Sequence, residues 1–418
     1  MILRYKSKTV DMRQSLNQYI AGLLLLPLYI DLMATLSALM GFSTKITTYV
    51  YYGALWILLL LSMPQILKSI TGNVCAGILI AAAFIGIQYI LFPSSRSYIT
   101  GMDMEDRFTF ASKTLLSVVP YILVGAAVND LPTLREMLHS SARVGIVMGT
   151  LSYLISIMKS YSIHYDDMSV AYAICVMICL LITDYRKYDI YFLIAGCLSL
   201  VLAGTRGPIL CVLCIILWRV IFYKSNVQKR ILKIILILIA IVILQSGLLL
   251  YLLELLADFF TAIGVKQLRI IDYVRSGMIL DSSGRDEIAD AVLQKIMENP
   301  IYGYGVGGDR IALRYRTYAH NIVLEMWVSY GVVIGTAILL WIAYWLIKGI
   351  RCPQTEMTVI VMGLSSGIVL KLLLSSSYLR SKELFLLLGI CMAGCAAKRR
   401  AAIKNAAVGE DLTNETMA

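Results

Sequence analysis

Three basic residues of this sequence stand where polar segments meet long apolar ones. They are Arg206 in AGTRGPIL, Arg285 in SSGRDEIADAV and His320 in TYAHNIVLEMWVSYG. An arginine side chain binds phosphate oxygens in pairs through its planar fork and stays charged. A histidine titrates near neutral pH and can take a proton from a hydroxyl group. These residue types together suit the transfer of a phosphate-activated group to a hydroxyl.

Each of the three residues also has a purely structural interpretation. Arg206 could anchor a helix end in lipid headgroups, although a cation within a membrane is a functional candidate by default. Arg285 could be a solvated surface residue, and His320 a hydrogen-bonded histidine at the interface. Taken alone, the sequence around Arg285 and His320 favours these structural interpretations. A functional site would require the three side chains to converge.

Further charged residues lie close to these candidates or interrupt apolar runs. Arg310, Arg314 and Arg316 form a cationic run ahead of His320. They could bind pyrophosphate or anionic sugars, but lipid headgroups are the favoured partners. Asp31 and Lys371 each interrupt an apolar run, either as a buried polar contact or as part of a polar cavity for a substrate headgroup.

Two short patterns could indicate a metal or a nucleotide, and neither is specific. SIHYDDM (162–168) offers three metal-binding side chains in a single loop, and the other acidic residues of the polar segment show no ligand spacing. GYGVGG (303–308) matches G-x-G-x-x-G, but no βαβ unit surrounds it. We therefore predict no metal and no nucleotide cofactor. The glycines predict a tight turn that shapes a site beside His320, with Tyr304 and Asn321 as further candidates for substrate contact.

The composition indicates the elements that must position these residues. Of 418 residues, 59% are hydrophobic and 15% are charged, and mean hydropathy is +0.78. A soluble domain needs more polar surface, and apolar runs near 20 residues match the thickness of a bilayer. The net charge of +11 then reflects orientation in a membrane rather than nucleic-acid binding. None of the nine cysteines falls in the polar segment 254–318, so no disulfide framework is expected there.

The hydropathy pattern predicts an all-α, polytopic membrane protein with about 12 spanning helices. Their expected extents are 16–41, 47–66, 74–92, 110–128, 143–159, 169–183, 189–203, 207–223, 233–253, 319–347, 358–378 and 384–397. Basic residues concentrate in alternate loops, which predicts that both termini are cytoplasmic. This orientation places residues 254–318 outside, and with them His320. His164 is expected outside as well, and His139 inside.

We therefore expect four regions along the chain. They are helices 1–9 over residues 1–253, a large extracytoplasmic loop over 254–318, helices 10–12 over 319–397 and a cytoplasmic tail over 398–418. Within the loop, Ile288, Val292 and Ile296 recur at helical spacing and predict a short amphipathic helix. Ser283 with Asp286 fits a capping box, and Asn299-Pro300 should end the helix.

Three motifs in this order resemble the O-antigen ligase and O-antigen polymerase family. The motifs are TRG at a membrane edge, SGR before an acidic and apolar helix that leads to ENPIYGYGVGG, and AHN before LE and YGVVIG. They cover roughly 204–335. Members of this family are integral-membrane enzymes of bacterial surface-polysaccharide assembly. Thr205 stands where the family often has serine, a mild change that keeps the hydroxyl.

The resemblance implies a role for each candidate. Arg206 and Arg285 match the arginines thought to hold the lipid pyrophosphate, and His320 matches the essential histidine after the large loop. The implied fold is similar to that of the C-type membrane glycosyltransferases, and the implied reaction needs neither metal nor nucleotide. The enzyme would lie in the bacterial cytoplasmic membrane with its site outside. There it would transfer a glycan from a polyprenyl-pyrophosphate carrier to an acceptor hydroxyl, with inversion at the anomeric carbon.

The expected functions differ in the acceptor that receives the glycan. A polymerase of O-antigen or capsular repeat units is favoured, because nothing in the sequence marks a protein or core-lipid acceptor. A ligase that moves the finished glycan to a lipid or protein is the alternative. A flippase or other transporter would explain the helix count, but it predicts paired halves with broken helices, and no such pairing is visible. A separate flippase and a chain-length regulator are expected partners.

Overall fold

The computed structural model describes residues 12–70, 72–93, 96, 118–158, 167–222, 251, 254, 255, 258, 262, 284–313 and 317–394. All regular structure within these ranges is helical, which confirms the all-α prediction for this part of the chain. The first group of helices is α1 (Met12–Met40), α2 (Thr44–Ser69), α3 (Gly72–Leu91), α6 (Val119–Ala126), α7 (Leu131–Met158), α8 (Asp167–Thr183), α9 (Asp189–Leu202) and α10 (Arg206–Phe222). The second is α14 (Arg285–Glu298), α15 (Gly308–Ala312), α16 (Ile322–Ile350) and α17 (Thr355–Leu374), followed by a 3-10 turn (Tyr378–Arg380) and a helix over 382–394.

Four described helices are long and apolar enough to cross a membrane. They are Gln14–Met40, Thr44–Ser69, Ile322–Ile350 and Thr355–Leu374. Large apolar side chains such as Trp56, Leu60 and Leu340 are exposed on them, as expected where lipid rather than water covers a helix. These helices support an integral membrane protein. The count of about 12 spans stays a prediction, and the expected span 233–253 lies almost wholly outside the described residues.

The predicted boundary of one helix is wrong by three turns. We expected a helix over 143–159, whereas α7 begins at Leu131. Asp130 accepts hydrogen bonds from the backbone N–H and the hydroxyl of Thr133, at 3.1 and 2.7 Å, and so caps the start. The charged residues of these three turns interrupt the apolar run without interrupting the helix, because their partners lie on neighbouring elements.

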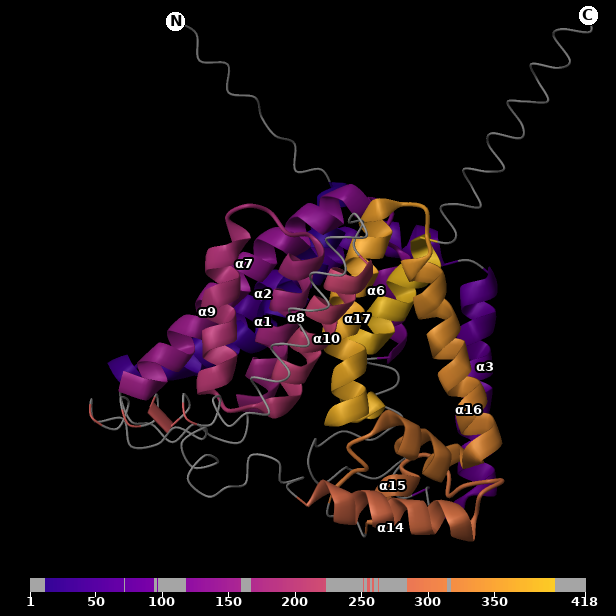
Figure 1. Ribbon diagram of the computed structural model, residues 1–418. Coiled ribbons are helices and arrows are strands. Elements are labelled where there is room, and N and C mark those ends of the chain that lie inside the picture. The colour runs from indigo at the N-terminus through magenta and orange to yellow at the C-terminus, as the bar shows by residue number, and fades with distance from the viewer. Residues whose placement is uncertain are drawn as a thin grey trace, which may run out of the picture.

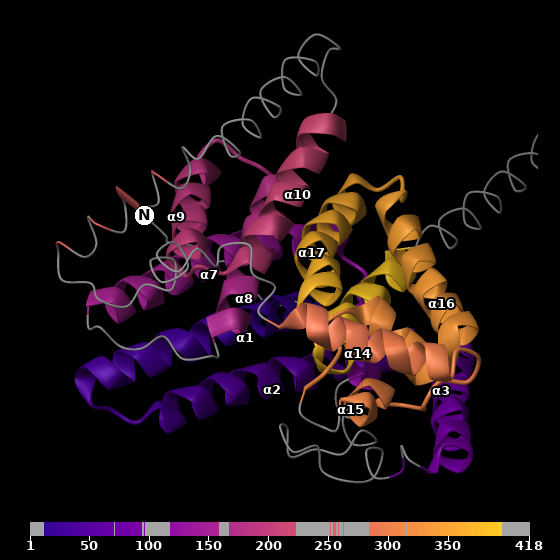
Figure 2. The same ribbon diagram turned by 60° about the horizontal axis from the view of Figure 1, so that its bottom comes forward.

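Helix α8 is the buried centre of the bundle, and α17 packs against it in the antiparallel direction. Gly363 of α17 meets Leu180 and Thr183, and one turn later Gly367 meets Val176. Small residues at such a crossing let two backbones approach closely. Helices α1 and α2 lie side by side along one flank in Figure 2, and α3 lies beside α16, where the rings of Phe84 and Tyr330 are 5.3 Å apart.

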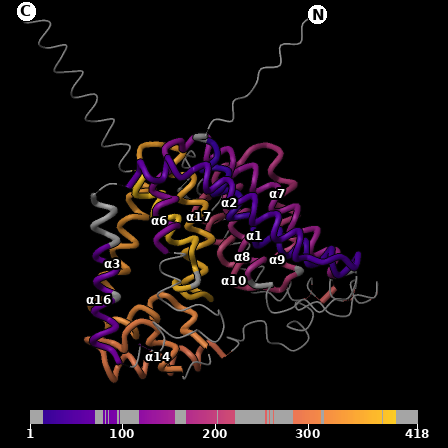
Figure 3. Tube along the Cα trace, turned by 180° about the vertical axis from the view of Figure 1, so that it is seen from behind, coloured from indigo at the N-terminus to yellow at the C-terminus, as the bar shows by residue number. Residues whose placement is uncertain are grey.

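The bundle has two distinct ends. Helices α14 and α15 gather at one end, below α16 and α17 in Figure 1, and the view from behind in Figure 3 agrees. We call this the loop end. The start of α16 and the end of α17 also lie there, since Asn321 Nδ2 donates to Leu373 O at 3.0 Å. At the opposite end, Thr358 Oγ1 donates to Ile350 O at 3.0 Å.

Candidate functional site

Arg285 is the first residue of α14 and is fixed to the end of α17. Its Nη1 donates to Leu374 O at 3.0 Å and its Nη2 to Ser375 Oγ at 3.1 Å. The predicted capping box is wrong: the cap is Gly284 at φ 74°, with no side-chain hydrogen bond. A left-handed conformation at the cap suits glycine, which has no Cβ. The helix ends at Glu298 as predicted, with Val292 and Ile296 buried.

His320 lies in the turn before α16 and has an unusual backbone. Its φ is 54°, a left-handed value that no other described non-glycine residue adopts. Such conformations are costly and cluster at functional sites. The imidazole stacks on Tyr318 with ring centroids 4.1 Å apart, and its Nε2 is 3.2 Å from Thr317 Oγ1. Nδ1 is buried, and the backbone of Ser375 lies within hydrogen-bonding reach of the imidazole.

Burial lowers the pKa of His320 from its ordinary value of 6.5. The backbone of Ser375 opposes this shift and raises the pKa, whereas the nearby Arg285 cation lowers it further. The net direction is downward, so the imidazole is neutral at pH 7. A neutral imidazole with a free ring nitrogen can accept a proton from a hydroxyl group.

Arg285 and His320 meet at residues 373–375, the end of α17. Tyr318 donates its hydroxyl to Ser375 O at 3.4 Å, and Ser375 also takes the Arg285 contact described above. The structure therefore brings together two of the three residues that the sequence singled out, although 35 positions separate them along the chain.

Arg206 begins α10 and reaches the same end of the bundle. It follows Gly204, which has φ 64°. The next residue, Gly207, touches the hydroxyl of Tyr172, so that a Cβ at this position would lie 2.2 Å from the hydroxyl oxygen. Tyr172 in turn lies beside Ser375 and within electrostatic reach of Arg285. Tyr172 therefore lies between the start of α10, where Arg206 stands, and the Ser375 region that Arg285 and His320 contact.

The remaining candidates for substrate contact have structural partners or cannot be placed. Arg314 and Arg316 lie outside the described residues. Asn321 caps α16 by accepting from Val323 N at 2.8 Å. The Tyr304 hydroxyl donates to Glu298 Oε2 at 3.1 Å. Substrate contacts for these four residues stay a prediction.

The glycine-rich loop, residues 299–308, packs against a break in α16. Helix α16 breaks at Gly331, where φ is 76° and ψ 165°. The loop closes this break with three backbone hydrogen bonds, Tyr304 N to Val328 O at 2.9 Å, Gly305 N to Ser329 O at 2.8 Å and Val332 N to Pro300 O at 2.7 Å. Gly303 and Gly305 have φ of 67° and 83°. The glycines therefore serve a turn and a close backbone approach, as predicted.

Replacing Gly331 with alanine should destabilise the protein by about 3 kcal/mol or more. A Cβ at this position would lie 2.0 Å from Ile301 O, and its backbone angles are nearly exclusive to glycine. Thermal unfolding in detergent would measure the loss. Gly53→Ala in α2 is the control, because nothing lies within 4 Å of its added Cβ. Equal unfolding temperatures for the two variants would contradict the prediction.

A buried ionic network supports the turn that carries His320. Arg310 Nη1 donates to both carboxylate oxygens of Asp309 at 2.8 Å and to Glu325 Oε1 at 2.6 Å. Asp309 also accepts from Ala319 N at 3.0 Å, directly before His320. All three charged side chains are buried. Assigning Arg310 to lipid headgroups is therefore wrong, because two carboxylates enclose its guanidinium.

This network was missed at the level of sequence, although one signal pointed to it. Glu325 stands in the first turn of a 29-residue apolar helix, where a carboxylate needs a buried partner. Glu325 also accepts from Tyr378 N at 3.0 Å. The network thus ties α16 to the segment after α17.

Arg310→Met should lower stability by about 3–5 kcal/mol, because it leaves Asp309 and Glu325 buried without their cation. Thermal unfolding in detergent is the measurement. Arg351→Met provides a control at an exposed arginine that caps the far end of α16, with an expected change within about 0.5 kcal/mol. If the Arg310→Met protein unfolds at the same temperature as the wild type, the network is not stabilising.

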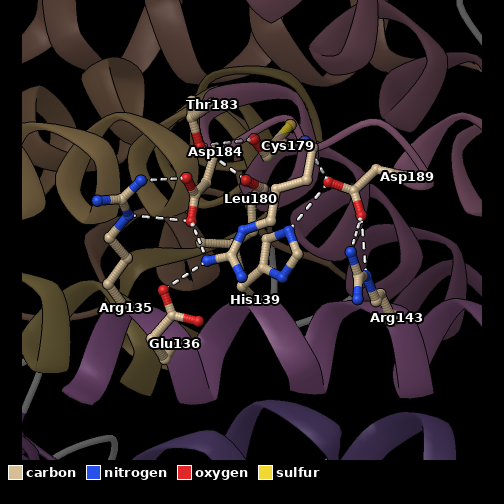
Figure 4. Close-up of polar contacts among 10 residues, drawn as sticks. Arg135, Glu136, His139, Arg143, Cys179, Leu180, Thr183, Asp184 and Asp189 are labelled. Carbon is tan, nitrogen blue, oxygen red and sulfur yellow. Dashed lines mark hydrogen bonds and ion pairs between the residues drawn. The ribbon is translucent and has the colours of Figure 1, made fainter. Parts of the chain in front are cut away.

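A second polar cluster lies at the end opposite the loop end, between α7 and the α8–α9 turn (Figure 4). His139 Nε2 is 2.9 Å from Asp189 Oδ2, and Arg143 is 2.7 Å from the same carboxylate. Arg135 pairs with Asp184. His139 and His320 therefore occupy opposite ends of the bundle, which agrees with their expected placement on opposite sides of the membrane.

The structure places Asp31 and Lys371, the two charged residues that interrupt apolar runs, in different surroundings. Asp31 accepts a hydrogen bond from Ser152 Oγ, so it serves as a polar contact between α1 and α7. Lys371 lies at the loop end, with its Nζ 5.3 Å from the ring centroid of Tyr172. His164 lies outside the described residues. Within the described ranges, no group of three His, Cys, Asp or Glu residues is placed to hold a metal.

The fold and the site together define a class of protein: a helical integral-membrane protein with arginines and a histidine at one end of the bundle. Residues 190–342 match the model of a family described as O-antigen ligase. This segment contains Arg206, Arg285 and His320, and the match supports the resemblance of this part of the chain to the O-antigen ligase and polymerase family. No curated protein matches the sequence.

The family match supports a ligase-type or polymerase-type function. It implies a lipid-linked glycan donor and an acceptor, and together with the apolar helices it indicates an integral protein of the inner membrane.

Proposed function

We propose that the chain transfers glycan from a polyprenyl-pyrophosphate carrier to an acceptor hydroxyl at the outer face of the bacterial cytoplasmic membrane. The observation that carries the proposal is the meeting of Arg285 and His320 at the end of α17. An enzyme on this face has no supply of nucleotide-activated sugars. Its donor must therefore be activated by the lipid carrier.

The reaction follows from the three side chains. Arg206 and Arg285 hold the pyrophosphate, and the imidazole of His320 takes the proton of the acceptor hydroxyl. The acceptor oxygen forms a bond to the anomeric carbon as the bond from that carbon to the pyrophosphate oxygen breaks. The bonding electrons leave with the pyrophosphate, where the guanidinium groups stabilise the added charge. A single in-line displacement inverts the anomeric carbon, and the fixed cations take the role that a metal ion plays elsewhere.

We favour polymerisation of O-antigen or capsular repeat units over ligation. Purified protein in lipid nanodiscs, supplied with lipid-linked repeat units alone, should produce a ladder of longer lipid-linked glycans. Glycan that appears only after a separate lipid or protein acceptor is added would establish the ligase alternative. A flippase and a chain-length regulator are the proposed partners of the polymerase.

The proposed orientation places the loop end outside the cell and both termini inside. In its support, Arg135, Arg143, Lys348 and Arg351 all lie at the opposite end, and basic residues favour the cytoplasmic face. In intact cells, a membrane-impermeant maleimide should label Asp290→Cys in α14 but leave Cys352 unlabelled. Labelling of Cys352 alone would reverse the orientation.

A further inference from the structure

Lys371 is a cation in an apolar helix, and no described carboxylate pairs with it. It is the one basic residue of α17, it is partly buried, and it forms no ion pair with a carboxylate in the part of the chain described. Its Nζ lies over the Tyr172 ring at 5.3 Å from the centroid. A cation at membrane depth is costly unless an anion or a polar cavity compensates for it, and it is therefore a functional candidate.

Two buried hydroxyl groups, those of Tyr172 and Thr205, lie beside Lys371 and Arg206. Thr205 is 2% exposed and Tyr172 3%; the Thr205 hydroxyl has no hydrogen-bond partner among the described residues, and the Tyr172 hydroxyl lies beside Ser375. Buried polar atoms are nearly always hydrogen-bonded, so each exception needs an explanation. Thr205 directly precedes Arg206, and the Tyr172 hydroxyl touches Gly207 at the start of α10. A bound ligand with several acceptor oxygens would satisfy the Thr205 hydroxyl and could be reached by the Tyr172 hydroxyl as well.

Lys371 also lies one helical turn from the atoms that fix Arg285. The Arg285 guanidinium binds Leu374 O and Ser375 Oγ, and residues three and four positions apart share a face of a helix. The backbone hydrogen bond from Ser375 N to Lys371 O, 2.8 Å long, shows that this last turn is intact. Lys371 and Arg285 therefore face the same region at the end of α17.

We propose that Lys371 and the Tyr172 hydroxyl complete the pyrophosphate site and bind the phosphate that becomes charged as the glycan leaves. This inference rests on the proposed function. The bound donor is a pyrophosphate diester, and the leaving pyrophosphate carries one more negative charge. Arg206 and Arg285 compensate for the negative charge of the bound donor. The ammonium of Lys371 compensates for the additional negative charge that develops as the glycan leaves. Stabilisation that is stronger in the transition state than in the bound donor raises kcat rather than lowering KM.

Lys371→Met tests the proposal, since methionine suits an apolar helix and removes only the charge. We expect kcat for glycan transfer to fall by about a hundredfold, with the KM for the lipid-linked donor within about threefold of wild type. Lys371→Arg should restore part of the rate. Tyr172→Phe should lower kcat by about tenfold, as for a single neutral donor. Lys348→Met is the matched control: Lys348 also lies over a tyrosine ring, 5.1 Å from the centroid of Tyr344, but at the opposite end of the bundle.

Binding measurements separate a phosphate role from a structural one. Polyprenyl pyrophosphate should bind Lys371→Met at least tenfold more weakly than wild type, and polyprenyl monophosphate less than threefold more weakly. Equal losses for both lipids, or a wild-type kcat, would overturn the proposal. If the wild-type protein binds pyrophosphate through Lys371 but transfers no glycan, then the proposed function fails while this binding site stands.

Discussion

Arg285→Ala should slow glycan transfer by about a hundredfold to a thousandfold, the effect of removing one preorganised charged donor from a site that stabilises developing charge. The guanidinium is already held by Leu374 O and Ser375 Oγ, so it needs little reorganisation when the pyrophosphate departs. Chain growth from purified lipid-linked repeat units is the measurement. Arg285→Lys should recover only a small part of the rate, because a lysine lacks the planar fork.

Lys295→Ala is the control for Arg285, because it removes another cation of α14. Lys295 forms an exposed pair with Glu298, and transfer should stay at the wild-type rate. Its thermal unfolding should be unchanged as well, since exposed ion pairs contribute little. If the Arg285→Ala protein is folded and transfers glycan at more than a third of the wild-type rate, Arg285 does not hold the leaving group.

His320→Ala should lower the rate of transfer by about a hundredfold to ten-thousandfold, the range expected for a lost general base. The pH dependence gives a sharper test. Because burial lowers the pKa of His320 from 6.5, the reactive neutral form persists below that value. The wild-type rate should therefore fall only as the pH drops below 6.5, and this acid limb should be absent from the residual activity of His320→Ala.

His139→Asn is the control for the pH profile. His139 is buried against Asp189 at the end opposite the loop end, so this variant should keep the acid limb whatever it does to stability. An acid limb that lies above pH 6.5 in the wild type would contradict the downward shift for His320. An acid limb that survives in His320→Ala would assign the titration to another group.

Hydropathy and residue chemistry predicted much of the molecule. Most described helices coincide with expected spans, because apolar runs near 20 residues admit few alternatives in a membrane. The face of α14 that carries Val292 and Ile296 is buried as its spacing predicted. The start of α7 was misplaced, since hydropathy cannot distinguish a charged loop from a helical turn whose charges are paired across the fold.

The Arg310 network and the break in α16 could not be read from local sequence. Arg310 and Glu325 are 15 positions apart, and only the fold reveals that they meet. Gly331 lies in YGVVIG within a continuous apolar run, so nothing marks it as the point where the helix opens. Both features depend on contacts between segments that the chain brings together in space, and sequence patterns report neighbours along the chain.

The three backbone hydrogen bonds between the glycine loop and the break in α16 bear on how this protein can be re-engineered. An exchange of the external segment 254–318 between two relatives would disturb these bonds. Carbonyl groups of a transmembrane helix would then be buried without hydrogen-bond partners. A working chimaera must therefore carry residues 299–335 from a single parent. By the same logic, any motion of the glycine loop during turnover must carry the first turns of α16, and His320 with them.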